Sequence, residues 1–296
     1  MSANRERAPT LRAVLREAVT QLRRADLAFG HGMHNARDEA VYLILHTLKL
    51  PLGELDVVLE RQLNARELRE VQAILSRRVR ERRPAAYLTR EAWLGPFKFY
   101  VDERVIVPRS FIAELLRDGL SPWVRDARRV RSVLDLCTGS GCLAVLAAHA
   151  FPQARIDASD LSAEALQVAR RNVKEYALGK RIRLVRSDLF ARLAVRRYDL
   201  ILSNPPYVNV AAMRALPREY RREPRRALAG GRDGLALVRR LLAQAPAHLN
   251  PDGLLVVEIG HNRAALERAY PHLPFTWLQT SAGDEFVFML HHEDLT

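Results

Sequence analysis

Residues 132–144 read Ser-Val-Leu-Asp-Leu-Cys-Thr-Gly-Ser-Gly-Cys-Leu-Ala, a short apolar run that passes through two glycines into a second apolar run. The first run is typical of a buried strand, and the second, 143–150, is typical of a helix. Glycines between them let the backbone turn sharply and approach a ligand, because no Cβ stands in the way. The stretch therefore predicts a strand–turn–helix unit with a ligand beyond the end of the strand.

Alternating strand and helix patterns continue from this unit to the end of the chain. Short apolar runs predict strands, and stretches with apolar residues three and four apart predict helices. Expected strands are 155–159, 183–186, 199–203, 254–259, 275–278 and 286–290, and expected helices are 163–176, 235–245 and 263–269. This alternation predicts an α/β fold with a Rossmann-like, doubly wound, mostly parallel sheet, which binds ligands beyond the carboxyl ends of its strands.

Before residue 121 the apolar residues follow a different pattern. Helical spacing recurs over 11–22 and 40–48, and a third helix is expected after Asn64, because Asn64 and Glu67 suit a capping box. Residues 87–107 then alternate like a β-hairpin. We therefore expect three parts: a helical substrate-recognition domain at 1–84, a bridging β-hairpin and linker helix at 85–120, and the sheet domain at 121–296.

The composition is that of a folded chain without a membrane anchor. Of the 296 residues 48% are hydrophobic, enough for a sizeable core, and no apolar run approaches the roughly 20 residues of a membrane span. The first residues, Asn4 to Arg7 among them, lack the apolar core of a signal peptide. Cys137 and Cys142 suit neither a disulfide framework nor a metal site. We therefore expect a soluble cytoplasmic protein without a metal or a membrane partner.

The charge balance is strongly basic. Lysine and arginine total 47 against 34 acidic residues, a formal net charge of +13. Such an excess is typical of proteins that contact nucleic acid. Only four of the 47 bases are lysine, and the base composition of the coding genome equally explains that preference. The basic run 77–83 likewise suits either a solvated helix end or an RNA contact. Charge therefore leaves contact with nucleic acid or a ribonucleoprotein open.

Acidic side chains stand at the ends of three successive predicted strands. Asp160 follows Gly141 by 19 residues, a spacing at which a carboxylate accepts hydrogen bonds from both hydroxyls of a ribose. Asp188 is placed either to accept a hydrogen bond from an adenine amino group or to cap a helix N-terminus. Asp135 is placed either to orient the glycine turn or to hold the amino end of a methionine moiety. Nicotinamide and S-adenosylmethionine binders share this spacing, so both cofactors remain open at this point.

The next predicted strand ends in Asn204-Pro205-Pro206-Tyr207. The prolines fix φ and hold the adjoining carbonyls in one direction. The Asn204 side chain and the Pro205 carbonyl then offer two acceptors to a planar NH₂ group, and Tyr207 offers a ring to stack on it. This arrangement aims a nitrogen lone pair at a sulfonium methyl, and methyl transfer depends mainly on such alignment. The candidate catalytic residues are Asn204, Pro205, Pro206 and Tyr207, and the candidate cofactor residues are Asp135, Cys137, Thr138, Gly139, Ser140, Gly141, Asp160, Asp188, Leu189 and Asn204.

With these motifs the chain resembles the class I methyltransferases that modify the side-chain amide of glutamine in proteins. The resemblance covers nearly the whole chain and rests on the motif 204–207, the glycine loop 137–141 and the later Glu223-Pro224-x-x-Ala227-Leu228-x-Gly230-Gly231-x-Asp233-Gly234. It implies the class I methyltransferase fold and S-adenosyl-L-methionine as the cofactor.

Several positions are similar to one branch of that family. Cys137 stands where the release-factor branch has glycine, and Ser110-Phe111 follow Val107-Pro108-Arg109. These features, with 29–32, 35–40 and 99–105, resemble the branch that acts on the third large-subunit ribosomal protein (L-three). The resemblance implies that one glutamine of that protein accepts the methyl group. With such a substrate, contact with ribosomal RNA or a ribosome-assembly intermediate stays open. Leu189 departs from the release-factor enzymes, which often have tryptophan there.

Two other functions remain as alternatives. The motif 204–207 also occurs in enzymes that methylate the exocyclic amino group of adenine in nucleic acid, which would suit the basic charge, although no nucleic-acid-reading module is recognisable. A non-catalytic, S-adenosylmethionine-binding factor of ribosome assembly is the second alternative, and the intact motif argues against it.

Overall fold

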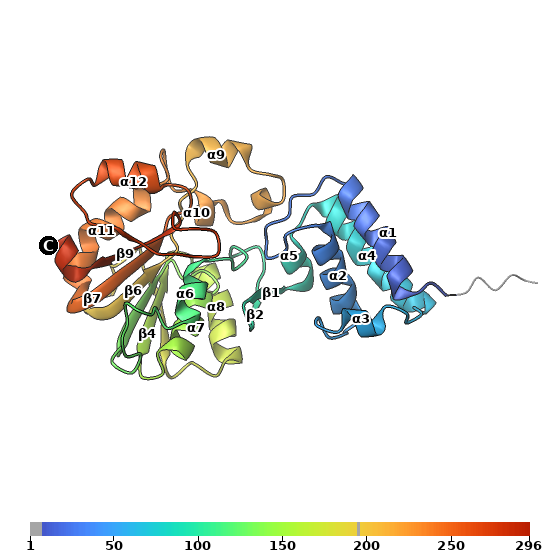
Figure 1. The fold of residues 1–296 in the computed structure, drawn as a ribbon, viewed down its shortest axis with the longest axis horizontal. Helices are drawn as coiled ribbons and strands as arrows, with labels where there is room; N and C mark the ends of the chain where they lie inside the picture. The colour runs from blue at the N-terminus through green and yellow to red at the C-terminus, as the bar shows by residue number, and fades with distance from the viewer. Residues whose placement is uncertain (1–7, 194–195) are drawn as a thin grey trace, which may run out of the picture. The chain divides into compact units, whose positions relative to one another are not determined.

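The computed structural model describes residues 8–193 and 196–296 (Figure 1). By its contacts the chain divides into a helical unit, Met1–Glu91 with Pro217–Arg222, and a sheet unit, Ala92–Leu216 with Glu223–Thr296. The helical unit therefore runs past residue 84, where we expected its end, and takes in a segment that follows the Asn204–Tyr207 motif. The charged start of the chain, Asn4 to Arg7, lies outside the described residues.

The helical unit is built on three longer helices; the first and third are amphipathic, and the second is buried over most of its surface. Leu22, Leu43 and Val71, one from each of these helices, are buried in its core. The predicted capping box at Asn64 and Glu67 is present and begins the third of them. The elements are α1 (Leu11–Arg24), α2 (Ala36–Thr47), α3 (Leu55–Val58), α4 (Ala65–Glu81) and α5 (Ala85–Thr89), with the 3₁₀ turn η1 (Tyr220–Arg222) in the inserted segment.

A buried ion-pair cluster attaches the inserted segment to these helices. The Arg78 side chain is fully buried; its Nε donates to Glu39 at 2.6 Å, and its Nη1 lies 3.5 Å from the Glu219 carboxylate. Arg82 Nη1 lies 3.2 Å from the same carboxylate. The basic run 77–83 is therefore not wholly a solvated surface, because Arg78 is buried and Arg82 is only partly exposed.

The sheet unit follows the predicted alternation. A hairpin of β1 (Glu91–Leu94) and β2 (Phe97–Tyr100) and the short α6 (Ile112–Arg117) precede the main sheet. The elements of the sheet and its helices are β3 (Ser132–Leu136), α7 (Cys142–Ala150), β4 (Arg155–Asp160), α8 (Ala163–Glu175), β5 (Ile182–Arg186), β6 (Tyr198–Ser203), α9 (Val210–Ala215), α10 (Arg225–Leu228), α11 (Ala236–His248), β7 (Leu249–Glu258), α12 (Arg263–Ala269), β8 (Thr276–Trp277), β9 (Val287–His291) and η2 (His292–Leu295).

The main sheet is doubly wound, as predicted. Its strand order is β5-β4-β3-β6-β7-β9-β8; β3 to β7 are parallel, and β9 runs antiparallel to both of its neighbours. The chain winds from β3 outward through β4 and β5, then crosses back to β6 on the other side of β3. The winding therefore reverses between β3 and β6, and α/β sheets of this kind bind ligands at such a reversal, beyond the carboxyl ends of the strands.

Helices cover both faces of the sheet (Figure 1). Leu134 and Leu136 of β3 pack in one core cluster with Leu241 of α11 and Leu266 of α12. On the other face α7 is buried from Cys142 to Ala148, so that it forms an inner layer. Among residues 8–193 and 196–296, no helix is long and apolar enough to cross a membrane.

Candidate active site

The glycine turn connects β3 to α7 through two left-handed glycines. Gly139 has φ +55° and Gly141 has φ +79°, conformations that a residue with a Cβ adopts at a cost. A Cβ on Gly141 would also lie 3.1 Å from the Cβ of Ala169 in α8, so glycine lets the two helices meet closely. The Ser140 carbonyl accepts a hydrogen bond from Asn172 of α8 at 2.8 Å. Contacts from α8 thus fix the backbone of the glycine turn.

Cys137 begins the turn in the same left-handed region, with φ +61°. This is the position at which the release-factor branch has glycine, so this chain holds a strained residue there. Burial, together with the nearby Asp160 and Asp135 carboxylates, raises the pKa of the Cys137 thiol. The thiol therefore stays neutral and contributes no nucleophile.

Asp135 lies fully buried beneath the turn. Its Oδ2 accepts hydrogen bonds from the Thr138 hydroxyl and from the Ala144 N–H of α7, the latter at 3.0 Å. Its Oδ1 is buried and has no hydrogen-bond partner among the described residues. Burial raises the pKa of this carboxyl to about 7. Asp135 therefore orients the turn and keeps one oxygen for a further donor.

Asp160 ends β4 beside the turn. One of its oxygens accepts from the Gly139 N–H at 2.9 Å and the other from the Ser162 N–H at 2.8 Å. Burial raises the pKa of Asp160, and these backbone donors oppose the rise. Because a carboxylate has about four lone-pair sites, lone pairs remain for an external pair of hydroxyls.

Asp188 and Leu189 follow β5. Asp188 does not cap a helix: its Oδ2 accepts from Arg240 of α11 at 2.9 Å, and both side chains are about half exposed. Leu189, with φ +47°, is buried in the core cluster on the α11 face. Sequence analysis missed Arg240, because nothing in the spacing connects α11 to the end of β5.

The Asn204–Tyr207 motif leaves the sheet beside the glycine turn. Ser203 and Leu136 are partners in the β3–β6 register, and the Ser203 hydroxyl donates to the Leu136 carbonyl at 3.0 Å. Asn204 therefore starts next to Cys137. The Asn204 side chain is half-buried, and among the described residues no hydrogen bond engages its amide.

Tyr207 is enclosed by glycines from the later motif and from the end of β7. A Cβ on Gly230 would lie 2.6 Å from the Tyr207 Cα, and one on Gly260 would lie 2.6 Å from its ring. A Cβ on Gly234 would clash with the Tyr207 carbonyl oxygen, and Asn262 donates to that carbonyl at 2.9 Å. Gly230 and Gly234 of the later motif therefore pack closely on Tyr207.

Two buried glutamates hold the turn 107–111 near Tyr207. Glu223 accepts from Val107 N–H at 2.9 Å and pairs with Arg109 through both of its oxygens, at 2.6 and 2.7 Å. Glu258, at the end of β7, holds the other end of the turn. Glu258 was not predicted as a site residue, although an acid at the carboxyl end of a predicted strand is the same signal that identified Asp160.

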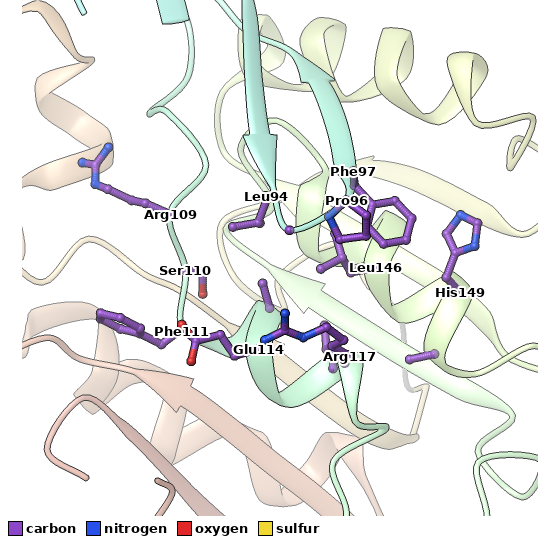
Figure 2. Close-up of a pocket in the computed structure, with 14 residues that line it drawn as sticks. Leu94, Pro96, Phe97, Arg109, Ser110, Phe111, Glu114, Arg117, Leu146 and His149 are labelled. Carbon is purple, nitrogen blue, oxygen red and sulfur yellow. The ribbon is translucent and has the colours of Figure 1, made fainter. Parts of the chain in front are cut away.

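A separate cavity of about 400 Å³ lies among the β1–β2 turn, α6 and α7. Figure 2 shows Phe97 of the hairpin beside His149 of α7, with ring centroids 4.9 Å apart. Arg109 and Ser110 also line this cavity, but none of the residues predicted for catalysis or cofactor binding does. The candidate active site is therefore the group of residues at the carboxyl ends of β3, β4 and β6, apart from this cavity.

Comparisons with known proteins identify the family of the chain. The family described as methyltransferase small domain matches residues 122–228. Proteins named ribosomal protein uL3 glutamine methyltransferase are similar over nearly the full length. The one from Neisseria gonorrhoeae is 58% identical over 97% of this chain and 95% of its own, and the one from Burkholderia pseudomallei is 56% identical over 97% and 95%. The one from Bradyrhizobium diazoefficiens is 46% identical over 97% and 92%. These matches confirm the predicted branch: the chain belongs to the family of ribosomal protein uL3 glutamine methyltransferases.

Proposed function

We propose that this protein transfers a methyl group from S-adenosylmethionine to the side-chain amide nitrogen of one glutamine in ribosomal protein uL3. One observation carries the proposal: Asn204-Pro205-Pro206-Tyr207 leaves β6 directly beside the glycine turn of β3. The names of the relatives supply the substrate. A ribosomal protein as substrate also favours the cytoplasm as the place of reaction.

The residues at these strand ends fit S-adenosylmethionine, which when bound supplies a methyl group on a positively charged sulfur. The partnerless buried oxygen of Asp135 suits the amino end of its methionine moiety. Asp160 has lone pairs for the two ribose hydroxyls. Asp188, held by Arg240, suits the adenine amino group. At Gly139 a Cβ would meet nothing closer than the Cys137 carbonyl at 4.0 Å, so this glycine leaves open space beside the turn.

The chain's own contribution to catalysis is orientation of the amide. Asn204 Oδ1 and the Pro205 carbonyl accept one N–H each, which fixes the plane of the amide and increases electron density on its nitrogen. Tyr207 supports that plane with its ring. The nitrogen held in this way would accept the methyl group that bound S-adenosylmethionine supplies, and it would release one proton to water. Orientation of this kind contributes about 7–11 kcal/mol in well-aligned reactions.

We also propose that the protein meets uL3 close to ribosomal RNA. The stretch 214–226 contains two acids, Glu219 and Glu223, and both are buried in ion pairs. Its arginines are all exposed: Arg214, Arg218, Arg221, Arg222, Arg225 and Arg226. A salt titration of binding to a ribosomal RNA fragment tests this, because each neutralised phosphate adds about one unit to the slope. A flat salt dependence would contradict the contact.

An assay with three acceptors tests the main proposal. Purified protein and labelled S-adenosylmethionine are incubated with uL3, with a uL3 variant whose labelled glutamine is replaced, and with RNA rich in unpaired adenine. We expect label in uL3 alone. Label in the RNA would establish the adenine-directed alternative, and cofactor binding without transfer to any acceptor would establish the non-catalytic one.

A further inference from the structure

Glu258 is a buried carboxylate surrounded by hydrogen-bond donors. It ends β7 and is 2% exposed. Its Oε2 lies 2.6 Å from the Ser110 hydroxyl and 2.9 Å from the Phe111 nitrogen, and its Oε1 lies 3.3 Å from the Tyr207 hydroxyl. Burying a carboxylate is costly unless donors meet both of its oxygens, and here they do.

The direction of each hydrogen bond follows from the neighbouring groups. A backbone N–H only donates, so Phe111 donates to Oε2. The Ser110 oxygen itself accepts from the Ile112 N–H at 3.2 Å, which leaves its hydrogen for the same Oε2. The remaining oxygen, Oε1, receives the hydrogen of the Tyr207 hydroxyl. Burial raises the pKa of Glu258, and these donors oppose the rise.

The same segment of chain also fixes the Tyr207 ring. Glu258 contacts the hydroxyl, and Gly260, two residues later, leaves no room for a Cβ beside the ring. Asn262 then binds the Tyr207 carbonyl. Glu258 at the end of β7 and the alternate residues Gly260 and Asn262 thus contact the hydroxyl, ring and backbone of one tyrosine.

We propose that Glu258 is a positioning residue for methyl transfer. By accepting the hydrogen bond of the Tyr207 hydroxyl, Glu258 sets the tyrosine ring in one orientation. The phenolic oxygen then has only its lone pairs to offer to the substrate. By holding Ser110 and Phe111, Glu258 joins the turn 107–111 to the same ring. The proposal rests on the proposed function, because its effect is measured as glutamine methylation.

The test is a double-mutant cycle on the full-length protein, with uL3 as the methyl acceptor. Glu258→Gln keeps the shape of the side chain but presents an NH₂ group to Tyr207, which reverses that hydrogen bond. Tyr207→Phe removes the hydroxyl and keeps the ring. We expect each variant to lower kcat by about tenfold or more, with the KM for uL3 and the cofactor Kd changed by less than about twofold. The double variant should be scarcely worse than the poorer single variant, because both substitutions remove one interaction.

A matched control is Glu267→Gln, which changes an exposed carboxylate of α12 that pairs with Arg263. We expect wild-type kcat from it. Wild-type kcat in Glu258→Gln, or losses that multiply in the double variant, would overturn the proposal. If Glu258→Gln fails to fold by circular dichroism, Tyr207→Phe decides: a lower kcat at unchanged KM supports the proposal and a wild-type kcat overturns it. Failure of the wild-type protein to methylate uL3 would instead refute the proposed function.

Discussion

Leu136 and Ser203 are the last residues of β3 and β6, and they are joined by a hydrogen bond from the Ser203 hydroxyl to the Leu136 carbonyl. Because both strands end at this pair, the glycine turn and the Asn204–Tyr207 motif begin side by side. A register shift of one residue would displace the motif by about 3.3 Å along the sheet. Nitrogen, carbon and sulfur must be aligned more closely than that, so this pair sets the geometry of the proposed reaction.

Asn204→Ala is expected to lower kcat by about 10²-fold or more while the cofactor Kd stays near wild type, since the variant loses one acceptor for the amide and no cofactor contact that binds strongly. Calorimetry and a turnover assay on one preparation measure both. Asn209→Ala is the control, because Asn209 only caps α9 through the Ala212 N–H. Unchanged turnover in Asn204→Ala would remove Asn204 from the mechanism.

Asp160→Ala should act on the cofactor instead. Losing the charge-assisted hydrogen bonds to two ribose hydroxyls, at about 1.5–3 kcal/mol each, should weaken S-adenosylmethionine binding at least tenfold. Asp252→Ala, an exposed acid of the same unit, serves as the control. NADH added in excess should not displace the cofactor. Competition by NADH would support the dinucleotide interpretation that the glycine spacing left open.

Asp135 should make stability depend on pH. The pKa of the buried carboxyl is about 7, against an ordinary value of 3.8, so the folded state binds a proton that the unfolded state has released. Stability is therefore highest below about pH 4 for this group, falls as the pH rises, and levels off above about pH 7. Between about pH 4 and pH 7 the free energy of unfolding of the wild type should fall by up to about 4 kcal/mol relative to that of Asp135→Asn. Denaturant unfolding of both proteins measures it, and parallel curves would contradict the assignment.

Substrate choice is predicted to lie in the helical unit, which includes Pro217–Arg222. An exchange of residues 1–91 alone for those of a release-factor glutamine methyltransferase leaves Glu219 without Arg78 and Arg82, whereas an exchange that also carries 217–222 keeps the ion pairs. Breaking a buried pair costs about 3–5 kcal/mol, so the first variant should be much less stable. A truncated protein that starts at residue 85 also leaves Glu219 without Arg78 and Arg82, so it should be destabilised in the same way.

The second exchange variant should bind S-adenosylmethionine normally and lose efficient methylation of uL3. Thermal melts, calorimetry and turnover on uL3 compare the two variants. Equal stability would argue against the role of Glu219. Full activity of the second variant on uL3 would show that the helical unit does not select the substrate.

The parts of the fold that local pattern controls were predictable from the sequence. The strand 132–136 and the capping box at Asn64 appear where they were expected, because each depends on residues close in the chain. Helices α9 and α10 were not predicted, since each is short and neither has an apolar period. α11 continues through Pro246 to His248, because a proline in the last turn removes few hydrogen bonds.

The contacts that complete the candidate site are long-range and were not predictable in the same way. Arg78 looked like one charge of a basic helix end, and only the fold brings Glu39 and Glu219 to it. Arg240 likewise reaches Asp188 from a distant helix. The glycines of the later motif were recognisable in the sequence as a pattern. The close packing of Gly230 and Gly234 on Tyr207 is seen only in the structure.

The most direct test of the account is the chemical form of the transferred methyl group. Acid hydrolysis of a methylated glutamine side chain releases the methyl group as methylamine, because the amide bond breaks between carbonyl carbon and nitrogen. We predict that uL3 labelled by this protein releases its label as methylamine, and that uL3 treated with Asn204→Ala releases almost none. Label that stays on an amino acid after hydrolysis, or that is found in RNA, would contradict methyl transfer to a glutamine amide.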